Sequence, residues 1–367
     1  MSLLRPAIML ALFIASSATA MASDVNSDSP AGAADAMAAD SDSPASAADA
    51  QAGRAPVLHH LTPEQHDIVW GIKGDPEPEV RNAYRKENEG QHFTTCDELN
   101  LHLFEPAVRG IGGAYAGVGT DQAYIFMGWA RSEIGWMLDY DPLVIRIHGL
   151  YRVFFMEAEN FERFLHLWSA EGAAEAREVI RRRVSFEPAA ESALELYAKF
   201  RAHINRRLMQ SMSLMRKAGV AFYLNDAATY DHVRNLVMTG RAVAVQANLL
   251  ADGGIKNIGE ASRRLGVPVR ALYLSNVEDY WAYGSQYMNN LQSLPYDDTS
   301  MILRTLAAKK SNGDYRYVQQ KATNLLKWLE SGKVRRTRDM FRRGAIRKSD
   351  EVQLVTIETD PDKKSVR

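Results

Sequence analysis

The stretch that most constrains the fold runs from residue 111 to residue 141, IGGAYAGVGTDQAYIFMGWARSEIGWMLDYD. An apolar run leads into a glycine-rich turn, a helical pattern over 122–131, and a second apolar run, Ile134 to Leu138, that ends in acids. The order strand, turn, helix and strand predicts the first half of a nucleotide-binding βαβ unit. The fold class that follows is α/β.

This unit also supplies the first candidate site residues. Gly117 and Gly119 are expected to let the backbone turn sharply and approach a ligand, and Asp121 is expected to cap or precede the helix. Asp139 and Asp141 follow the second strand about 20 residues further on, where such folds place the carboxylate that holds ribose hydroxyls. The unit predicts a binding site for a nucleotide-type molecule but does not indicate which reaction, if any, the protein catalyses.

Helical patterns dominate the next part of the chain. Residues 144–158 form an amphipathic pattern, and 160–218 repeat large apolar residues every three or four positions, which is typical of core packing. The second block is too long for a simple crossover, so we assign 157–218 to a helical insertion lying over the sheet. Two roles stay open for the insertion, a lid over the binding cleft and a scaffold.

Strands and helices alternate again after the insertion. Strands are predicted over 242–248, 267–274, 299–306 and 352–358, and helices over 255–265 and 315–329. The sequence therefore predicts one Rossmann-like domain over 55–360, with a mostly parallel, doubly wound sheet and the large helical insertion.

Polar residues follow the predicted strand 267–274. Ser275, Asn276 and Glu278 stand at its carboxyl end, where open α/β sheets place substrate or cofactor contacts. The alternative is that Ser275 and Asn276 only cap the helix that follows.

The N-terminal segment has the pattern of an export signal. Residues 1–22 carry one positive charge, an apolar run and small residues at the expected cleavage positions, so we expect a signal peptide and an exported, periplasmic or secreted protein. The alternative is that residues 1–22 are retained as an N-terminal membrane anchor. Residues 23–54 are rich in Ala, Ser, Asp and Pro and are expected to form a disordered tether, and 361–367 a loose tail. No transmembrane segment is expected in the mature chain.

Charge limits the partners. The formal net charge is −1, which argues against a whole-protein nucleic-acid binder. Residues 333–348 nevertheless hold eight Lys or Arg and one Asp. This run either meets phosphate, anionic lipid or another acidic partner, or forms a solvated loop.

Other chemistries have little support in the sequence. The histidines match no zinc spacing, so no metal is expected. Motifs of serine hydrolases, zincins, thioredoxins and P-loop proteins are missing. The one cysteine, Cys96, is interpreted as packed or incidental rather than as a catalytic thiol.

The arrangement resembles the S-adenosylmethionine-dependent methyltransferase superfamily with its Rossmann-like sheet. It is most similar to an uncharacterised bacterial family with YxGVGxDQ and LSNVExY motifs. The matching stretches are 115–122 (YAGVGTDQ), 137–141 (MLDYD) and 274–280 (LSNVEDY), and the resemblance covers roughly residues 90–310.

The resemblance implies S-adenosylmethionine as a cofactor and a role for each matching residue. The glycines would line its methionine end, an acid after the second strand would hold its ribose, and Asn248 would lie near its adenine. Ser275 and Asn276 would face the transferred methyl group. The implied cofactor-binding set is Tyr115, Gly117, Gly119, Asp121, Gln122, Asp139, Asp141 and Asn248.

Methyl transfer from a sulfonium mainly requires alignment of the nucleophile, the methyl group and the sulfur, with a base only if the acceptor must lose a proton. Glu278, Asp279 and His148 are the candidate bases. Export argues against an active enzyme, because S-adenosylmethionine is made in the cytoplasm.

Three hypotheses follow. The first is an exported methyltransferase-like domain that retains a cleft for a small-molecule ligand. The second is an active methyltransferase acting on a small molecule or a protein side chain. The third is an envelope-binding or scaffold protein that uses its helical block and the basic segment 333–348.

Overall fold

The computed structural model of the protein describes residues 58–78, 90–307, 314–343, 346–348 and 353–362. The predicted signal peptide, the tether and residues 363–367 of the predicted tail lie outside these residues. In the part of the chain that the structure describes, no helix has both the length and the apolar character that a membrane span requires.

The described residues form an α/β fold built on one mixed sheet with the strand order β3-β2-β1-β4-β5-β6-β8-β7. The first five strands are parallel, β6 is antiparallel to β5, β8 is parallel to β6, and β7 is antiparallel to β8. The strands are β1 (Ala114–Val118), β2 (Ile134–Asp139), β3 (Ala242–Gln246), β4 (Val269–Tyr273), β5 (Met301–Ala307), β6 (Tyr315–Lys321), β7 (Ile346–Lys348) and β8 (Leu354–Ile357).

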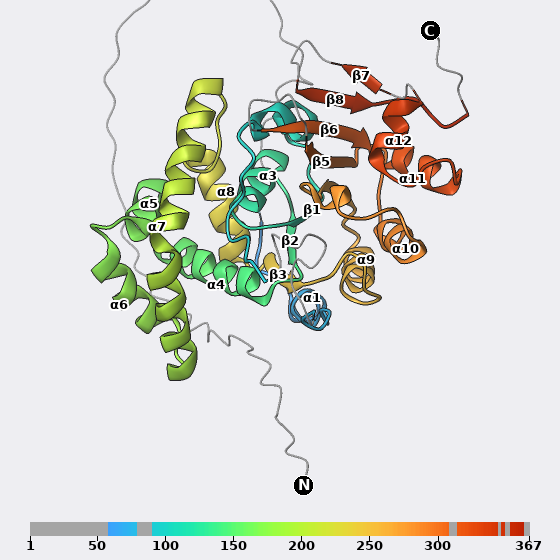
Figure 1. The fold of residues 1–367 in the computed structure, drawn as a ribbon. Helices are drawn as coiled ribbons and strands as arrows, with labels where there is room; N and C mark the ends of the chain where they lie inside the picture. Colours follow the sequence, from blue (N-terminus) through green and yellow to red (C-terminus); the bar gives the residue numbers. More distant parts are fainter. Residues whose placement is uncertain (1–57, 79–89, 308–313, 344–345, 349–352, 363–367) are drawn as a thin grey trace, which may run out of the picture.

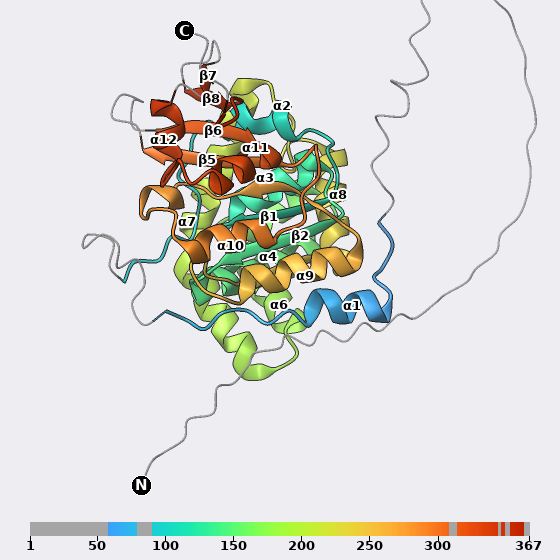
Figure 2. The ribbon, with the colours of Figure 1, turned by 90° about the vertical axis from the view of Figure 1, so that its right-hand side faces the viewer.

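Helices cover both faces of this sheet, so the fold is doubly wound (Figure 1). One face carries α2 (Glu105–Val108), α3 (Asp121–Ala130), α4 (Pro142–Glu157), α5 (Phe161–Trp168), α6 (Ala173–Arg183), α7 (Glu187–Ala218) and α8 (Ala227–Met238). The other carries α1 (Pro63–Trp70), α9 (Gly254–Leu265), α10 (Ser285–Ser293), α11 (Ala322–Glu330) and α12 (Thr337–Arg342). Figure 2 shows α9 and α10 lying in front of the sheet.

Alternation along each strand divides the hydrophobic core into two clusters. Tyr115 of β1 packs in the cluster under α3 and α4, whereas its neighbours Ala114 and Ala116 pack in the cluster under α9 and α10. Successive side chains of a strand point to opposite faces, and parallel sheets with both faces covered are apolar on both. This arrangement confirms the predicted Rossmann-like fold.

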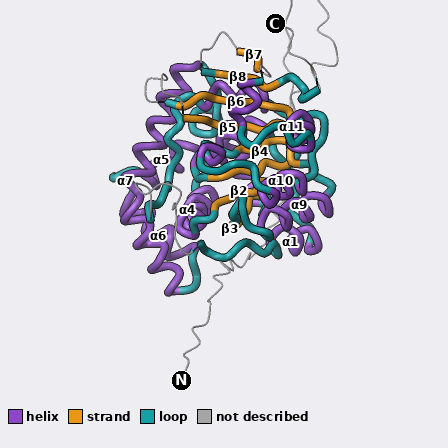
Figure 3. Tube along the Cα trace, turned by 45° about the vertical axis from the view of Figure 1, so that its right-hand side comes forward, coloured by secondary structure: helices purple, strands orange, loops and turns teal. Residues whose placement is uncertain are grey.

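The insertion consists of α5, α6 and α7, which follow one another between α4 and α8. Figure 3 shows this helical block at one side of the sheet. The longest helix, α7, has 32 residues and ends at Gly219, whose φ of +67° is the left-handed conformation favoured after a helix. The predicted insertion is therefore confirmed, while α8 was not anticipated.

One secondary-structure prediction is wrong in its first half. Residues 315–329 were expected to form a single helix, but 315–321 form β6, and α11 begins only at Ala322. β6 begins with Tyr-Arg-Tyr-Val, which is rich in strand formers, and the whole strand pairs with β5 over seven residue pairs. An Asn-Gly pair at 312–313, the strongest short-range hairpin signal, stands in the sequence between the two strands.

One of the two interpretations of the basic run 333–348 is a solvated loop. The structure instead builds α12 and the edge strand β7 from it. Met340 of α12 is buried against the core cluster below α11, which explains why the segment is folded despite its charge.

Candidate functional site

A cleft of about 920 Å³ lies at the carboxyl ends of the five parallel strands. The chain runs from β1 outward to β3 and then returns to place β4 on the other side of β1, so the cleft lies where the strand order reverses. Open α/β sheets bind their ligands at this point. Each strand end contributes to the wall: Val118 and Gly119 at the end of β1, Asp139 to Asp141 at the end of β2, Ala247 to Leu249 after β3, Ser275 to Val277 after β4, and Ala307 of β5.

The glycine turn after β1 is filled by a side chain of its own chain. Gly119 has a φ of +89°, and the amide of Gln122 occupies the space where a Cβ at Gly119 would stand. Gln122 Nε2 donates to the carbonyl oxygen of Val118 at 2.9 Å, and its Oε1 accepts the amide of Thr120 at 3.1 Å. Gly119 and Gln122 both line the cleft, but the expected open approach to the glycine backbone is wrong.

Gly117 and Tyr115 lie below the cleft rather than in its lining. The hydroxyl of Tyr115 occupies the space beside Gly117, and its ring stacks on Phe126 with centroids 6.1 Å apart. Tyr115 is completely buried. Residue 117 must be glycine to admit this ring, so the predicted contact of Gly117 and Tyr115 with a ligand is corrected to a packing role.

Asp121 also faces away from the cleft. Its carboxylate accepts the backbone amide of Cys96 at 2.7 Å and Nε of Arg207 on α7 at 3.0 Å, and both side chains of the ion pair are almost completely buried. Asp121 therefore joins the helical insertion to the first turn of α3. It is corrected from a cofactor contact to a structural residue.

His148, a candidate base, is held in the core below the turn. Its Nε2 donates to the carbonyl oxygen of Gly119 at 2.9 Å, so its Nδ1 accepts from the hydroxyl of Tyr124 at 2.9 Å. Burial lowers the pKa of His148 to about 4. The neutral ring fixes the glycine turn and is corrected from base to positioning residue.

Asp139 and Asp141, the two acids at the end of β2, have different roles. Asp141 is buried, begins α4 by accepting the amide of Leu143 at 2.9 Å, and pairs with Nδ1 of His92 at 2.7 Å. Asp139 is half-buried in the cleft wall and accepts the amide of Asp141 at 2.9 Å. Burial raises the pKa of Asp139 to about 7, although this amide donates to it. Asp139 can therefore change its charge near neutral pH.

Asn248 lines the cleft after β3. Its backbone amide donates to Oδ2 of Asp75 at 2.8 Å, and its own Oδ1 accepts the amide of Leu250 at 2.9 Å. Asp75 Oδ1 also accepts the amide of Gly254 at the start of α9, at 3.0 Å. Asp75 therefore fixes the loop that presents Asn248.

Ser275 and Asn276 stand in the cleft after β4. Ser275 has a φ of +48°, a left-handed conformation that is uncommon outside glycine, and its hydroxyl donates to Oε1 of Glu98 at 2.5 Å. Asn276 Nδ2 lies 3.4 Å from the hydroxyl of Tyr315. The side chain of Asn276 makes no capping bond to the 3-10 turn Val277–Asp279 that follows, so the capping alternative does not describe it.

Glu278, the third candidate after β4, lies outside the cleft lining. Its carboxylate pairs with Arg304 at 2.8 Å, accepts the hydroxyl of Tyr287 at 2.8 Å and accepts the hydroxyl of Thr337 of α12 at 2.5 Å. Glu278 and Arg304 are both buried. The turn directs Glu278 into this network, and its predicted role as a base is corrected to a structural one.

Glu98 is a cleft residue that the sequence analysis missed. Its Oε1 accepts the hydroxyls of Tyr273, Ser275 and Thr305, and its Oε2 accepts the thiol of Cys96. Glu98 is 2% exposed. It belongs to the segment 92–98, which forms one wall of the cleft ahead of β1 and has no periodic pattern or motif that would have marked it.

Cys96 is buried beside this carboxylate. Burial, and then the negative charge of Glu98, raise the pKa of the Cys96 thiol well above its ordinary value. A reactive cysteine needs the opposite environment, because the thiolate is the nucleophile. The packed interpretation of Cys96 agrees with this environment.

The cleft is acidic. Asp97, Glu98, Asp139, Asp141 and Asp279 line it, and the lining residues that the structure describes include two histidines but no Lys or Arg. Aromatic side chains complete the wall: Phe93, Tyr140, Tyr280, Trp281 and Tyr315. Such a surface favours cationic or neutral ligands and disfavours phosphate groups.

The described residues contain no group of three or more His, Cys, Asp or Glu side chains arranged to hold a metal ion.

Comparison with known proteins identifies a family. A family model described as Domain of unknown function (DUF7790) matches residues 93–358. The chain belongs to the DUF7790 family. The DUF7790 match begins in the cleft wall 92–98 and ends just after β8, so it covers the whole sheet, whereas α1 and Asp75 precede it. Among curated proteins, none matches the chain.

Proposed function

We propose that the cleft binds a small adenosine-type molecule that carries a positive charge and no phosphate, with S-adenosylmethionine as the candidate. One observation carries the proposal: Asp139 lies half-buried at the end of β2 beside the strand-order reversal, in a cleft whose described lining lacks Lys and Arg. A carboxylate at this position suits two ribose hydroxyls as donors.

Charge supports S-adenosylmethionine over a dinucleotide. Dinucleotide sites place a pyrophosphate on the glycine turn at the start of the first helix. Here Gln122 fills that turn and binds the amide of Thr120, and the carboxylate of Asp121 stands at the helix start. A sulfonium is instead attracted by the acids and the aromatic rings of the wall.

Strand order divides the cleft into two halves. Asp139 and Asn248 lie on the β2 and β3 side, and Ser275, Asn276 and Tyr315 lie on the β4 to β6 side. The volume is near the upper end of the roughly 300–1,000 Å³ of small-molecule sites. This room favours a second candidate function, methyl transfer to a small acceptor bound on the β4 side.

Calorimetry tests the ligand. We expect S-adenosylmethionine and S-adenosylhomocysteine to bind with micromolar Kd, S-adenosylmethionine the tighter because of its charge, and ATP and NAD not to bind. Asp139→Asn should weaken binding about tenfold or more, since hydrogen bonds to charged groups contribute roughly 1.5–3 kcal/mol. The matched control is Asp298→Asn, an exposed acid outside the cleft. Tighter binding of ATP, or equal binding by Asp139→Asn and the wild type, would refute the proposal.

Transfer is tested separately from binding. The protein is incubated with S-adenosylmethionine labelled in its methyl group and a mixture of small-molecule acceptors, and labelled products are sought by mass spectrometry. Product formation that is lost in Asn276→Ala supports the methyltransferase. Binding without product supports a binding domain instead.

Export remains part of the proposal. A reporter fused after Gly53 should appear outside the cytoplasm if residues 1–22 act as a signal peptide. If the reporter stays in the cytoplasm, the protein has access to the S-adenosylmethionine made there, and the active methyltransferase is favoured.

A further inference from the structure

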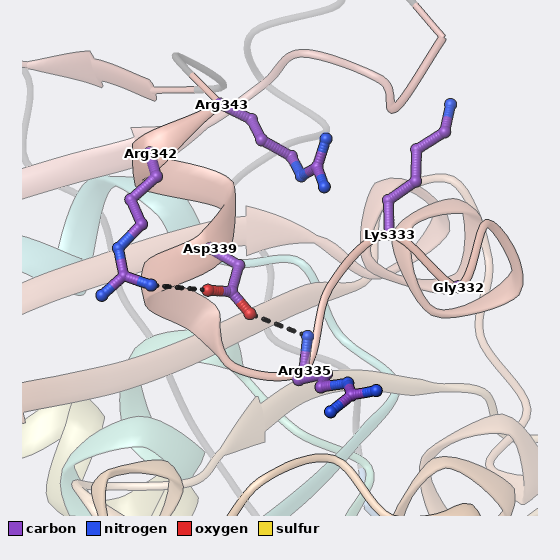
Figure 4. A pocket seen from close by; sticks show the side chains of 6 residues that line it. All are labelled: Gly332, Lys333, Arg335, Asp339, Arg342 and Arg343. Carbon is purple, nitrogen blue, oxygen red and sulfur yellow. Dashed lines mark hydrogen bonds and ion pairs between the residues drawn. The ribbon is translucent and has the colours of Figure 1, made fainter.

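A second pocket lies apart from the cleft, on the C-terminal part of the fold. It has a volume of about 340 Å³ and lies between the turn after α11 and the helix α12 (Figure 4). This basic pocket is lined by Gly332, Lys333, Arg335, Asp339, Arg342 and Arg343. It shares no lining residue with the cleft.

The single acid of the basic pocket is already bound. Asp339 Oδ2 accepts the backbone amides of Arg335 at 2.8 Å and Arg336 at 3.1 Å, and Oδ1 lies 3.2 Å from Nη1 of Arg342. Figure 4 shows Asp339 between Arg342 and the backbone nitrogen of Arg335. Asp339 therefore offsets the charge of Arg342 and makes no side-chain ion pair with Arg335 or Arg343.

Two guanidinium groups of the basic pocket have no partner within the described part of the chain. These belong to Arg335 and Arg343, both of them exposed. The ammonium of Lys333 reaches Oδ1 of Asp362 at 2.7 Å, but this pair is open to solvent and weak. The basic pocket thus presents two guanidinium groups and one loosely held ammonium.

Two other arginines of the basic run, Arg336 and Arg338, bind a residue outside the basic pocket. Arg338 Nη2 donates to Oδ1 of Asp279 at 2.9 Å, and Arg336 Nη1 lies 3.3 Å from the carbonyl oxygen of Asp279. These two side chains fasten α12 to the wall of the cleft. Among the described arginines of the run, Arg336 and Arg338 therefore hold α12 against the cleft wall, whereas Arg335 and Arg343 line the basic pocket without a partner in the described residues.

We propose that the basic pocket binds a phosphate monoester group. Planar guanidinium groups match the oxygens of phosphate in pairs, and a doubly charged anion gains more from two of them than a carboxylate does. A pocket accommodates one discrete group, whereas a bilayer needs a broad surface. No aromatic residue stands in its described lining, so stacked nucleic-acid bases would find no partner there.

The test uses the full chain and phenyl phosphate, inorganic phosphate and benzoate as probes, titrated by calorimetry at low salt. We expect phenyl phosphate and inorganic phosphate to bind with a Kd of about 1 mM or tighter and benzoate about tenfold more weakly. Cosedimentation with vesicles of phosphatidylcholine and phosphatidylglycerol tests binding to anionic lipid separately. We expect the protein to stay in the supernatant.

The decisive variant is Arg335→Gln with Arg343→Gln. Phosphate binding should fall at least tenfold, because each guanidinium supplies charge-assisted hydrogen bonds to the phosphate oxygens. The matched control is Arg206→Gln with Arg264→Gln, two exposed arginines outside both pockets, which removes the same charge. It should change the affinity by less than about twofold.

Three results would overturn the proposal: no saturable binding of either phosphate probe, an equal loss in the control pair, or binding to the anionic vesicles alone. Binding of S-adenosylmethionine is measured on the same variants and should be unchanged. The anion proposal and the cleft proposal can therefore fail independently.

Discussion

Replacing Asp139 by Asn is expected to raise the free energy of unfolding at alkaline pH, although it lowers the affinity of the cleft for its ligand. Burial raises the pKa of Asp139 to about 7 from its ordinary 3.8. Between these two values the folded protein binds the proton more tightly than the unfolded chain does, so ionisation of Asp139 costs stability as the pH rises from about 4 to about 7. Asparagine carries no charge in either state and is spared this cost.

The magnitude follows from the same two values. Their difference corresponds to roughly 4 kcal/mol above pH 7 as an upper limit. Asp139 is open to water on its cleft side, which screens the charge, so we expect a gain of about 1–3 kcal/mol in the free energy of unfolding at pH 8. An asparagine oxygen can still accept the amide of Asp141, so this hydrogen bond is kept.

Urea unfolding of the wild type, Asp139→Asn and Asp298→Asn at pH 5 and pH 8 measures the effect. The gain from Asp139→Asn should be smaller at pH 5, because the carboxyl is then mostly protonated in the folded wild type. The exposed Asp298 should show no comparable gain at either pH. An equal gain at both pH values, or a loss at pH 8, would refute the assignment of the cost to a buried charge.

Four further predictions concern the cleft and its walls. Affinity for S-adenosylmethionine should rise about tenfold from pH 6 to pH 8 if ionised Asp139 holds the ribose; a flat profile would contradict this role. Arg207→Met should lower the free energy of unfolding by about 3 kcal/mol in urea titrations, because it leaves a buried carboxylate unpaired; a loss below about 1 kcal/mol would show that the site relaxes. Cys96 should react with iodoacetamide at least about 100-fold faster in urea than in the native protein, and equal rates would contradict its burial. Gly119→Ala should destabilise by about 1–3 kcal/mol even when combined with Gln122→Ala, because the positive φ persists; full recovery in the double variant would assign the cost to the side-chain contact alone.

The central unit was predictable because its signals are local. Apolar periodicity marks β1, α3 and β2, and the rule that ligands bind at the carboxyl ends of parallel strands brings Asp139, Asn248 and Ser275 together before any contact is known. These residues are far apart in the sequence, but the topology places them at one edge of the sheet.

Side-chain direction within a turn was not predictable. Ser275 and Glu278 are three positions apart, yet the left-handed conformation at Ser275 leaves the serine in the cleft while the following turn directs the glutamate to Arg304. No propensity distinguishes the two residues. Gln122 likewise carries no sequence signal that it folds back over Gly119.

The wall 92–98 was missed for another reason. Glu98 is fixed by residues of β4, β5 and α7, at separations of up to 207 positions, and the backbone of Cys96 is fixed by Asp121 of α3. The segment has no regular structure of its own. Only the assembled fold brings Thr305 to Glu98. Function in this wall depends on tertiary contacts, which local patterns do not encode.

The contact of Arg207 with Asp121 limits how this domain can be shortened. A minimal version without residues 160–218 would keep every parallel strand, yet it would remove the guanidinium that pairs with Asp121 in the first turn of α3 and the cleft-lining side chain of His203. Lineages or engineers that trim the chain must therefore replace Asp121 at the same step. The insertion and the sheet are best regarded as one indivisible folding unit.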